Sequence, residues 1–177
     1  HRWVNAVKKC VADIASNFTT NRMLIDYEER FYNKLAQRKK LMLDKNYIMA
    51  RQIAAWKRKV SAAWDNIVIR DVKRAEIETE AMYVGKKYHF ELTIDLAGLQ
   101  KEDIGAELVV ATQIEAGQAA NVVETRRLEV VASDDKSVTL ALDYAPEHTG
   151  MFDVALRVFP VNDNLEHRMD FALVKWA

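Results

Sequence analysis

The residues that most often carry chemistry are few in this sequence and stand far apart. They are four histidines and a single cysteine: His1, His89, His148, His167 and Cys10. Zinc sites use such residues at short spacings, for example two histidines four residues apart on one helix, and no such pair occurs. No glycine-x-serine-x-glycine elbow or phosphate-binding loop is present to mark a nucleophile. The sequence therefore predicts no catalytic residue, no cofactor-binding residue and no metal ligand, and it predicts that Cys10 is a small buried hydrophobe.

Two polar clusters have the residue types of a catalytic pair and of a calcium loop. Paired catalytic carboxylates lie in clefts, whereas Asp134 and Asp135 stand in a turn signal between two apolar runs, where acids favour turn geometry. Residues 162–166 are rich in oxygen ligands but lack the ligand spacing and the turn glycine of a calcium loop. Both clusters are predicted to be polar turns.

Aromatic rings are the remaining candidates, because an exposed flat ring can stack on the face of a sugar. Tyr83 and Trp176 are the candidate platforms for binding a carbohydrate. Tyr88 and Tyr144 occupy the apolar phase of their segments, which predicts that both rings lie in a hydrophobic core.

Residues 71–177 must position these rings, and their apolar residues recur with the period of two that is typical of strands. The clearest run is Tyr88 to Leu96, which alternates apolar and polar side chains. Further strands are expected near residues 74–83, 108–114, 122–132, 138–144, 152–158 and 169–173. About seven short strands separated by turn signals predict an antiparallel β-sandwich domain with an immunoglobulin-like architecture, although the cysteine–tryptophan–cysteine signature is absent.

Residues 1–70 have the period of an α-helix instead. The apolar residues from Trp3 to Ile14 lie on one face, and Thr19 or Thr20 could cap a following helix that carries Met23, Tyr27 and Phe31 on one side. A long linker helix follows, with an apolar seam formed by Met42, Met49, Ile53, Trp56, Val60, Ala63 and Ile67. A seam this short is more typical of packing within one molecule than of a dimeric coiled coil. A homo-oligomer is kept as an alternative. The predicted fold class is therefore α+β, with a helical segment at 1–70 and the sandwich at 71–177.

Charge divides at nearly the same place. Residues 1–70 hold 15 Lys and Arg against 6 Asp and Glu, and residues 71–177 hold 11 against 20. A basic helical half could bind nucleic acid through counterion release. The basic residues are interleaved with an apolar stripe and match no nucleic-acid motif, so an acidic protein surface is the expected partner and nucleic acid is not.

Composition limits the location and class of the protein. Half of the 177 residues are apolar, which is enough to form a real core, and no apolar run is long enough for a membrane helix. The chain starts at His1 without an initiator methionine, and we interpret it as an excised segment of a cytoplasmic protein.

Three segments carry a resemblance to a known family. Residues 18–32 contain the pattern Phe-Thr-x-x-Arg-Met-x-x-x-Tyr-x-x-x-Phe-Tyr, which resembles the end of the catalytic part of bacterial and archaeal alpha-glucan phosphorylases. Residues 56–64 are similar to the Trp-Lys-x-x-Val-x-x-x-Trp linker helix of those glycosyltransferases, and residues 150–160 and 167–177 are similar to their C-terminal extension. The matches follow the family's order along the chain.

The resemblance implies that the chain is the C-terminal fragment of a glycogen or starch phosphorylase. The intact enzyme would use pyridoxal phosphate to convert alpha-1,4-glucan and phosphate into glucose 1-phosphate. No segment here resembles the family's lysine motif for that cofactor, so the fragment is expected to hold no cofactor and to be inactive. Its expected role is structural, with the catalytic domains of the parent chain as partner. The alternatives are a glucan-binding module and a stand-alone protein-interaction domain.

Overall fold

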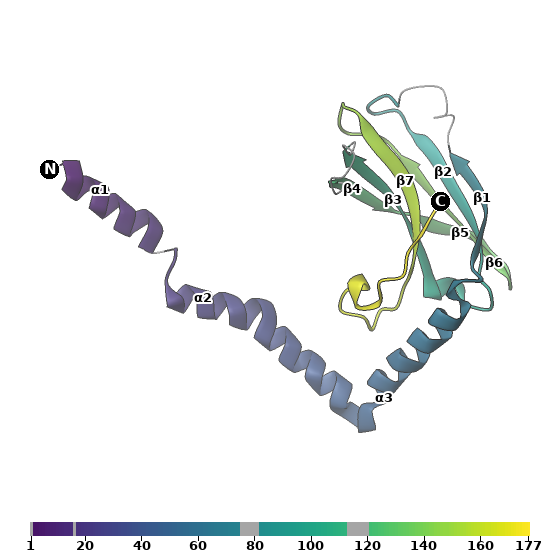
Figure 1. Cartoon of the computed structure of the whole chain (residues 1–177), viewed down its shortest axis with the longest axis horizontal. Helices are drawn as coiled ribbons and strands as arrows, with labels where there is room; N and C mark the ends of the chain where they lie inside the picture. Colours follow the sequence, from purple (N-terminus) through teal and green to yellow (C-terminus); the bar gives the residue numbers. More distant parts are fainter. Residues whose placement is uncertain (1, 16, 75–81, 113–120) are drawn as a thin grey trace. The chain divides into compact units, whose positions relative to one another are not determined.

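The computed structural model describes residues 2–15, 17–74, 82–112 and 121–177, and the chain forms two compact units (Figure 1). The units are His1–Gln52 and Ile53–Ala177. The sequence pattern divided the chain at residue 70, where the period changes, whereas the contacts group the end of the linker helix with the strands.

The first unit is helical. It contains α1 (Arg2–Cys10), the π-helical turn η1 (Val11–Ala15), α2 (Thr20–Tyr27), the π-helical turn η2 (Glu28–Tyr32) and the first part of α3 (Asn33–Trp64). The side-chain oxygen of Thr19 accepts a hydrogen bond from the backbone N–H of Arg22 at 3.2 Å, so Thr19 is the N-cap of α2, one of the two predicted caps. Residues 44–47 interrupt α3 with non-helical backbone angles, which the regular seam did not predict.

None of the described residues of this unit is buried. The large apolar side chains of its helices face outward, including Trp3 and Phe18, which are both 77% exposed. Cys10 is also exposed, and the prediction that it is buried is wrong, because no second element packs on its helix within the described residues of this unit.

Over its described residues, the second unit contains two four-stranded sheets, in which the strand pairs are antiparallel. One sheet has the order β1-β2-β6-β5, with β1 at Val68–Arg74, β2 at Tyr88–Asp95, β6 at Ser137–Tyr144 and β5 at Glu129–Ser133. The other has the order β4-β3-β7-β8, with β4 at Val122–Arg127, β3 at Ile104–Thr112, β7 at Phe152–Pro160 and β8 at Lys175–Trp176. The α+β class and the antiparallel sheets are confirmed.

One hydrophobic core lies between the sheets. It draws Phe90, Leu92 and Ile94 from β2, and it includes Leu108 from β3 and Leu156 from β7. In β2 the residues of the predicted apolar phase are all buried, while the intervening ones are partly or fully exposed. This alternation is the physical reason why the period of two predicted the strand.

Two expected strands differ in the structure. Residues 169–173 are not a strand: the 3-10 helix η4 (Arg168–Phe171) forms instead, because the His167 ring accepts the N–H of Met169 while the Asp170 carboxylate accepts the N–H of His167. The expected strand at 122–132 is two strands, β4 and β5, which belong to different sheets. Most of the expected strand at 74–83, and residues 113 and 114, lie outside the described residues.

Candidate functional site

The end of the linker helix is packed onto the sandwich. Within Ile53–Trp64, Val60 and Trp64 belong to the core between the sheets, together with Ile67 just beyond the helix. Trp56 and Ala63 pack against the same core as partly buried side chains. The predicted seam is therefore a packing face within one molecule over this stretch.

Asp103 joins this helix to the loop before β3. The residue is the last of the 3-10 helix η3 (Lys101–Asp103), and it is 9% exposed. Its carboxylate accepts the indole N–H of Trp56 at 2.7 Å, the ammonium of Lys59 at 3.2 Å and the backbone N–H of Gln100 at 3.0 Å. Burial acts to raise the pKa of Asp103, but these donors prevail and hold it below its ordinary value. Asp103 is thus a charged anchor for the helix.

The C-terminal segment, residues 168–177, contacts the same helix and the residues just after it. The Phe171 ring stands edge-on to Trp56, with 5.4 Å between the ring centroids. Lys57 donates to the backbone carbonyl of Asp170 at 2.6 Å. The ammonium of Lys175 donates to the carbonyls of Ile67 at 2.8 Å and Asp65 at 3.2 Å, just after the helix ends, where a positive charge is favoured.

A buried carboxylate fixes the C-terminal segment to the sheet in turn. Glu107 on β3 is 7% exposed and forms ion pairs with Arg157 of β7 and Arg168 of η4. The Arg157 guanidinium lies over the Trp176 ring, 5.7 Å from its centroid. Sequence reasoning missed this cluster, although a single acidic residue in the apolar run Ile104–Thr112 is a signal for a buried ion pair.

A cleft of about 680 Å³ lies elsewhere in the sandwich. Its lining comes from the segment before β2, from β3, β4, β6 and β7, and from the loop between β6 and β7. Tyr83 lines it and is 61% exposed. The volume is in the range typical of small-molecule sites.

Hydrogen bonds fix the polar part of the cleft. The Tyr144 hydroxyl donates to Glu124 at 3.0 Å, and the Arg126 guanidinium lies 2.5 Å from the other oxygen of that carboxylate. Burial and the Glu124 hydrogen bond raise the pKa of Tyr144 to about 12. The phenol therefore stays protonated at neutral pH and acts as a donor, not as a base.

The two candidate glucan-binding rings are not brought together. Tyr83 lines the cleft, which reaches β7 at Phe152–Val154, whereas Trp176 pairs with Arg157 farther along β7 and is not among the lining residues. Both rings are exposed, and sugar binding by either stays a prediction. Tyr88 and Tyr144 are buried, as predicted.

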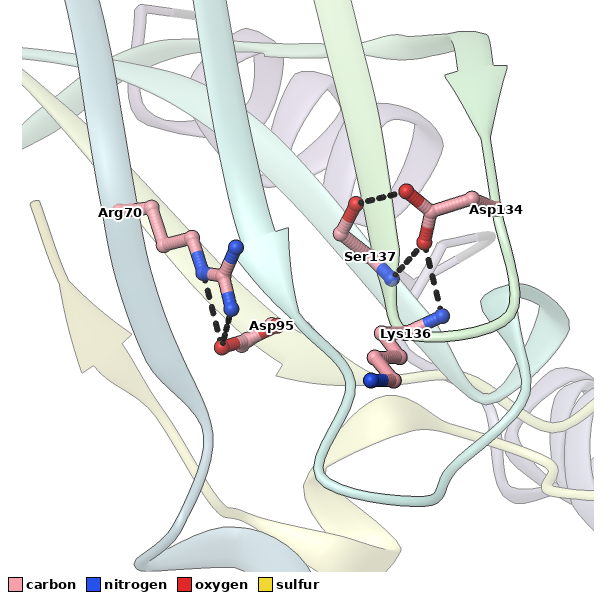
Figure 2. A network of polar contacts seen from close by, with 5 residues as sticks. All are labelled: Arg70, Asp95, Asp134, Lys136 and Ser137. Carbon is pink, nitrogen blue, oxygen red and sulfur yellow. Dashed lines mark hydrogen bonds and ion pairs between the residues drawn. The ribbon is translucent and has the colours of Figure 1, made fainter.

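The Asp134–Asp135 pair lies in the turn between β5 and β6. Figure 2 shows the Asp134 carboxylate turned back on Lys136 and Ser137, whose backbone N–H groups donate at 2.7 and 2.6 Å. These hydrogen bonds hold the pKa of Asp134 below its ordinary value. Figure 2 also shows Arg70 of β1 paired with Asp95 of β2. Asp134 therefore serves the turn, and residues 162–166 form another polar turn, in which Asn162 accepts the N–H of Asn164 at 2.9 Å.

The lining of the cleft beside Tyr83 does not fit pyridoxal phosphate. That cofactor needs a lysine for its Schiff base and a cradle for its phosphate. The described residues that line this cleft include no lysine or arginine. In a second cleft, of about 500 Å³, Lys101 is exposed and its ammonium lies 3.5 Å from the Ser133 hydroxyl. Within the described residues, no group of three His, Cys, Asp or Glu side chains gathers to hold a metal ion.

No helix in the described part of the chain has the length and apolar character needed to cross a membrane.

Known proteins resemble this chain over most of its length. The family model for the glycogen phosphorylase C-terminal domain matches residues 64–177. The chain is 26% identical over 179 residues to the maltodextrin phosphorylase of Thermococcus litoralis, an alignment that covers 99% of this chain and 20% of that protein. It is 26% identical over 158 residues to the glycogen phosphorylase of Mycobacterium tuberculosis, which covers 89% of this chain and 16% of that protein. No solved structure matches significantly. The chain thus spans a fifth or less of the length of these relatives.

Proposed function

The chain belongs to the glycogen phosphorylase C-terminal domain family, and we propose that it is the non-catalytic C-terminal part of a cytoplasmic alpha-glucan phosphorylase. The intact enzyme is a glycosyltransferase that uses pyridoxal phosphate to convert alpha-1,4-glucan and phosphate into glucose 1-phosphate. The part described here has a structural role, in which its helices cover the catalytic domains of the same chain.

The observation that carries this proposal is the exposure of the helical unit. Its apolar side chains stand at helical spacing, yet none of its described residues is buried. Covering one such side chain contributes about 1.5–3 kcal/mol, so a helix with several of them is stable only against a partner surface. A catalytic domain in the same polypeptide supplies that surface without any loss of entropy from bringing two molecules together.

The helix junction supports the structural role. Asp103 and Phe171 hold Ile53–Trp64 against the sandwich, and Lys175 donates to a carbonyl just after this helix, so the loop before β3 and the C-terminal segment both contribute. This anchoring would make the sandwich a support for the linker helix that leads to the catalytic part.

The strand order supports the proposal that the sandwich is immunoglobulin-like. When the strands are lettered in chain order as A, B, C, C′, D, E, F and G, the two sheets become A-B-E-D and C′-C-F-G. The immunoglobulin architecture places A, B, E and D in one sheet and C, F and G in the other.

The test is association with the polypeptide encoded upstream of His1, produced separately. We expect the 177-residue chain to bind it with a measurable Kd in sedimentation or calorimetry. Replacing Trp3 and Phe31 by Ser, which removes two exposed apolar side chains, should weaken binding at least tenfold, while the matched polar change Asn5→Ser should not.

Two outcomes would contradict the structural proposal. One is the absence of any association with the upstream polypeptide. The other is a stable homodimer of the 177-residue chain that loses its stability in the Trp3 and Phe31 variant, because the apolar helices would then have a second copy as their partner.

A second candidate function is glucan binding by the sandwich. The observation that favours it is the exposure of the two aromatic rings, Tyr83 and Trp176, in the domain joined to this linker helix. Affinity electrophoresis of the chain in gels that contain glycogen would detect such binding as a retarded mobility.

A further inference from the structure

The backbone of Tyr83 is held in place by hydrogen bonds on both sides. Its own N–H donates to the Tyr88 hydroxyl at 2.7 Å, and its carbonyl accepts the N–H of Lys86 at 3.2 Å. The turn that follows is tied to the next segment by the N–H of Gly85, which donates to the carbonyl of Pro146 at 3.0 Å. An exposed ring on a fixed turn loses little conformational entropy when a ligand stacks on it.

The walls of the cleft combine apolar and hydrogen-bonding groups. Val84, Met151 and Phe152 supply apolar surface, and His148 and Thr149 supply polar side chains. A sugar ring has the matching character, because its C–H faces pack on apolar and aromatic surface while its hydroxyl edges form hydrogen bonds.

The charges of the cleft indicate which ligands it disfavours. Among the described residues, the lining contains two carboxylates, Glu124 and Asp153, and neither lysine nor arginine. A phosphate or carboxylate ligand would meet like charge at close range, which is unfavourable. Arg126 already pairs with Glu124, so this carboxylate would attract a cationic ligand less strongly than an unpaired carboxylate would.

We propose that the cleft beside Tyr83 binds a neutral oligosaccharide, with the Tyr83 ring as the stacking platform. The proposal rests on the second candidate function and goes beyond it, because it names one site, excludes phosphorylated sugars and assigns no part of this binding to Trp176.

The test is a titration of the 177-residue chain followed by backbone amide NMR signals. The ligands are maltoheptaose, cellohexaose, glucose 1-phosphate and tetralysine. Maltoheptaose or cellohexaose should shift the signals of residues 82–86 and 147–154 saturably, while glucose 1-phosphate and tetralysine should not. The choice between the two sugars reports the linkage that the cleft accepts, and saturable binding of either one supports the proposal.

Three variants locate the site. Tyr83→Ala keeps the backbone N–H that bonds to Tyr88 and should raise Kd about tenfold, equivalent to about 1.4 kcal/mol. Tyr83→Phe keeps the ring and should change Kd less than threefold. Trp176→Ala removes an exposed ring outside the cleft lining and should leave Kd unchanged.

The proposal would be overturned if neither neutral sugar shifted any signal at a millimolar concentration and a tenfold molar excess over the chain. Tighter binding of tetralysine or glucose 1-phosphate than of the sugars would also overturn it. So would loss of sugar binding in Trp176→Ala but not in Tyr83→Ala. The structural role of the helices is tested separately by association with the upstream polypeptide. Failure of sugar binding would therefore not contradict the structural role. Failure of the association with the upstream polypeptide would not contradict sugar binding.

Discussion

Replacing Asp103 by alanine should detach the end of the linker helix from the sandwich. The change removes the acceptor for Trp56, Lys59 and the backbone N–H of Gln100. Hydrogen bonds to a charged group contribute about 1.5–3 kcal/mol each, whereas the half-exposed ammonium of Lys59 adds about 1 kcal/mol or less. Water can hydrogen-bond to some of the donor groups that lose Asp103, so we expect the free energy of unfolding to fall by about 3 kcal/mol in total.

The assay is thermal and urea unfolding of the 177-residue chain. A loss of about 3 kcal/mol corresponds to a fall in Tm of roughly 10 °C for a chain of this size. Asp103→Asn keeps the shape and one acceptor, so its loss should be about 1 kcal/mol. Hydrogen exchange should show reduced protection of the amides in residues 53–64 of the alanine variant, because the helix opens locally before the sandwich unfolds.

The matched control is Asp135→Ala, which also removes one carboxylate but from an exposed turn. If Asp103→Ala lowered Tm no more than this control, or left the exchange of residues 53–64 unchanged, the reasoning about the junction would be refuted.

The pH dependence follows from the lowered pKa of Asp103. A carboxylate whose pKa is lower in the folded state than in the unfolded state contributes stability above its unfolded pKa, and this contribution is lost as pH falls through the folded value. Wild type should therefore lose more stability than Asp103→Asn below about pH 4. Equal acid sensitivity of the two proteins would contradict the assignment.

Three further changes test other parts of the structure. Glu107→Ala leaves two arginines without their shared carboxylate and should lower the free energy of unfolding by about 3 kcal/mol, seen as a lower urea midpoint; a change under 1 kcal/mol would argue against a buried ion pair. Gly105→Ala places a Cβ 2.7 Å from the side chain of Val161 and should cost about 1–3 kcal/mol in the same assay, and a neutral result would show that the contact relaxes freely. The hydrogen bond that the His89 ring donates to the Asp143 carboxylate raises the pKa of His89, so the small stability that this pair adds is present below about pH 6.5 and is lost as pH rises through the raised value. A Tm profile of His89→Gln that parallels wild type between pH 5 and 9 would contradict this.

The sequence predicted those features that depend on one periodic segment. Alternation in Tyr88–Asp95 predicted a strand with one buried face. The apolar seam of the linker helix, which repeats every seven residues, predicted that Val60 faces a core. The motifs in residues 18–32, 56–64, 150–160 and 167–177 predicted the family, which the comparison confirms. Each of these signals lies in neighbouring residues, where a pattern can be read directly.

The features that the sequence did not predict depend on distant partners or on competing local hydrogen bonds. Asp103 meets Trp56 and Lys59 across more than forty residues, and no local pattern marks that pairing. The alternation in residues 169–173 is genuine, but the caps provided by His167 and Asp170 favour a 3-10 helix over a strand. The chain from β4 to β5 changes sheets at the buried Leu128, which an apolar run alone does not reveal.

The measurement that tests the central claim most directly is the release of glucose 1-phosphate by the 177-residue chain alone. The chain is given maltoheptaose, inorganic phosphate and pyridoxal phosphate, and the intact parent enzyme serves as the positive control. Our account predicts no release above the protein-free blank, because the role we propose for the chain is structural and the lining of the cleft beside Tyr83 does not fit the cofactor. Release that grows in proportion to the concentration of the chain would contradict it.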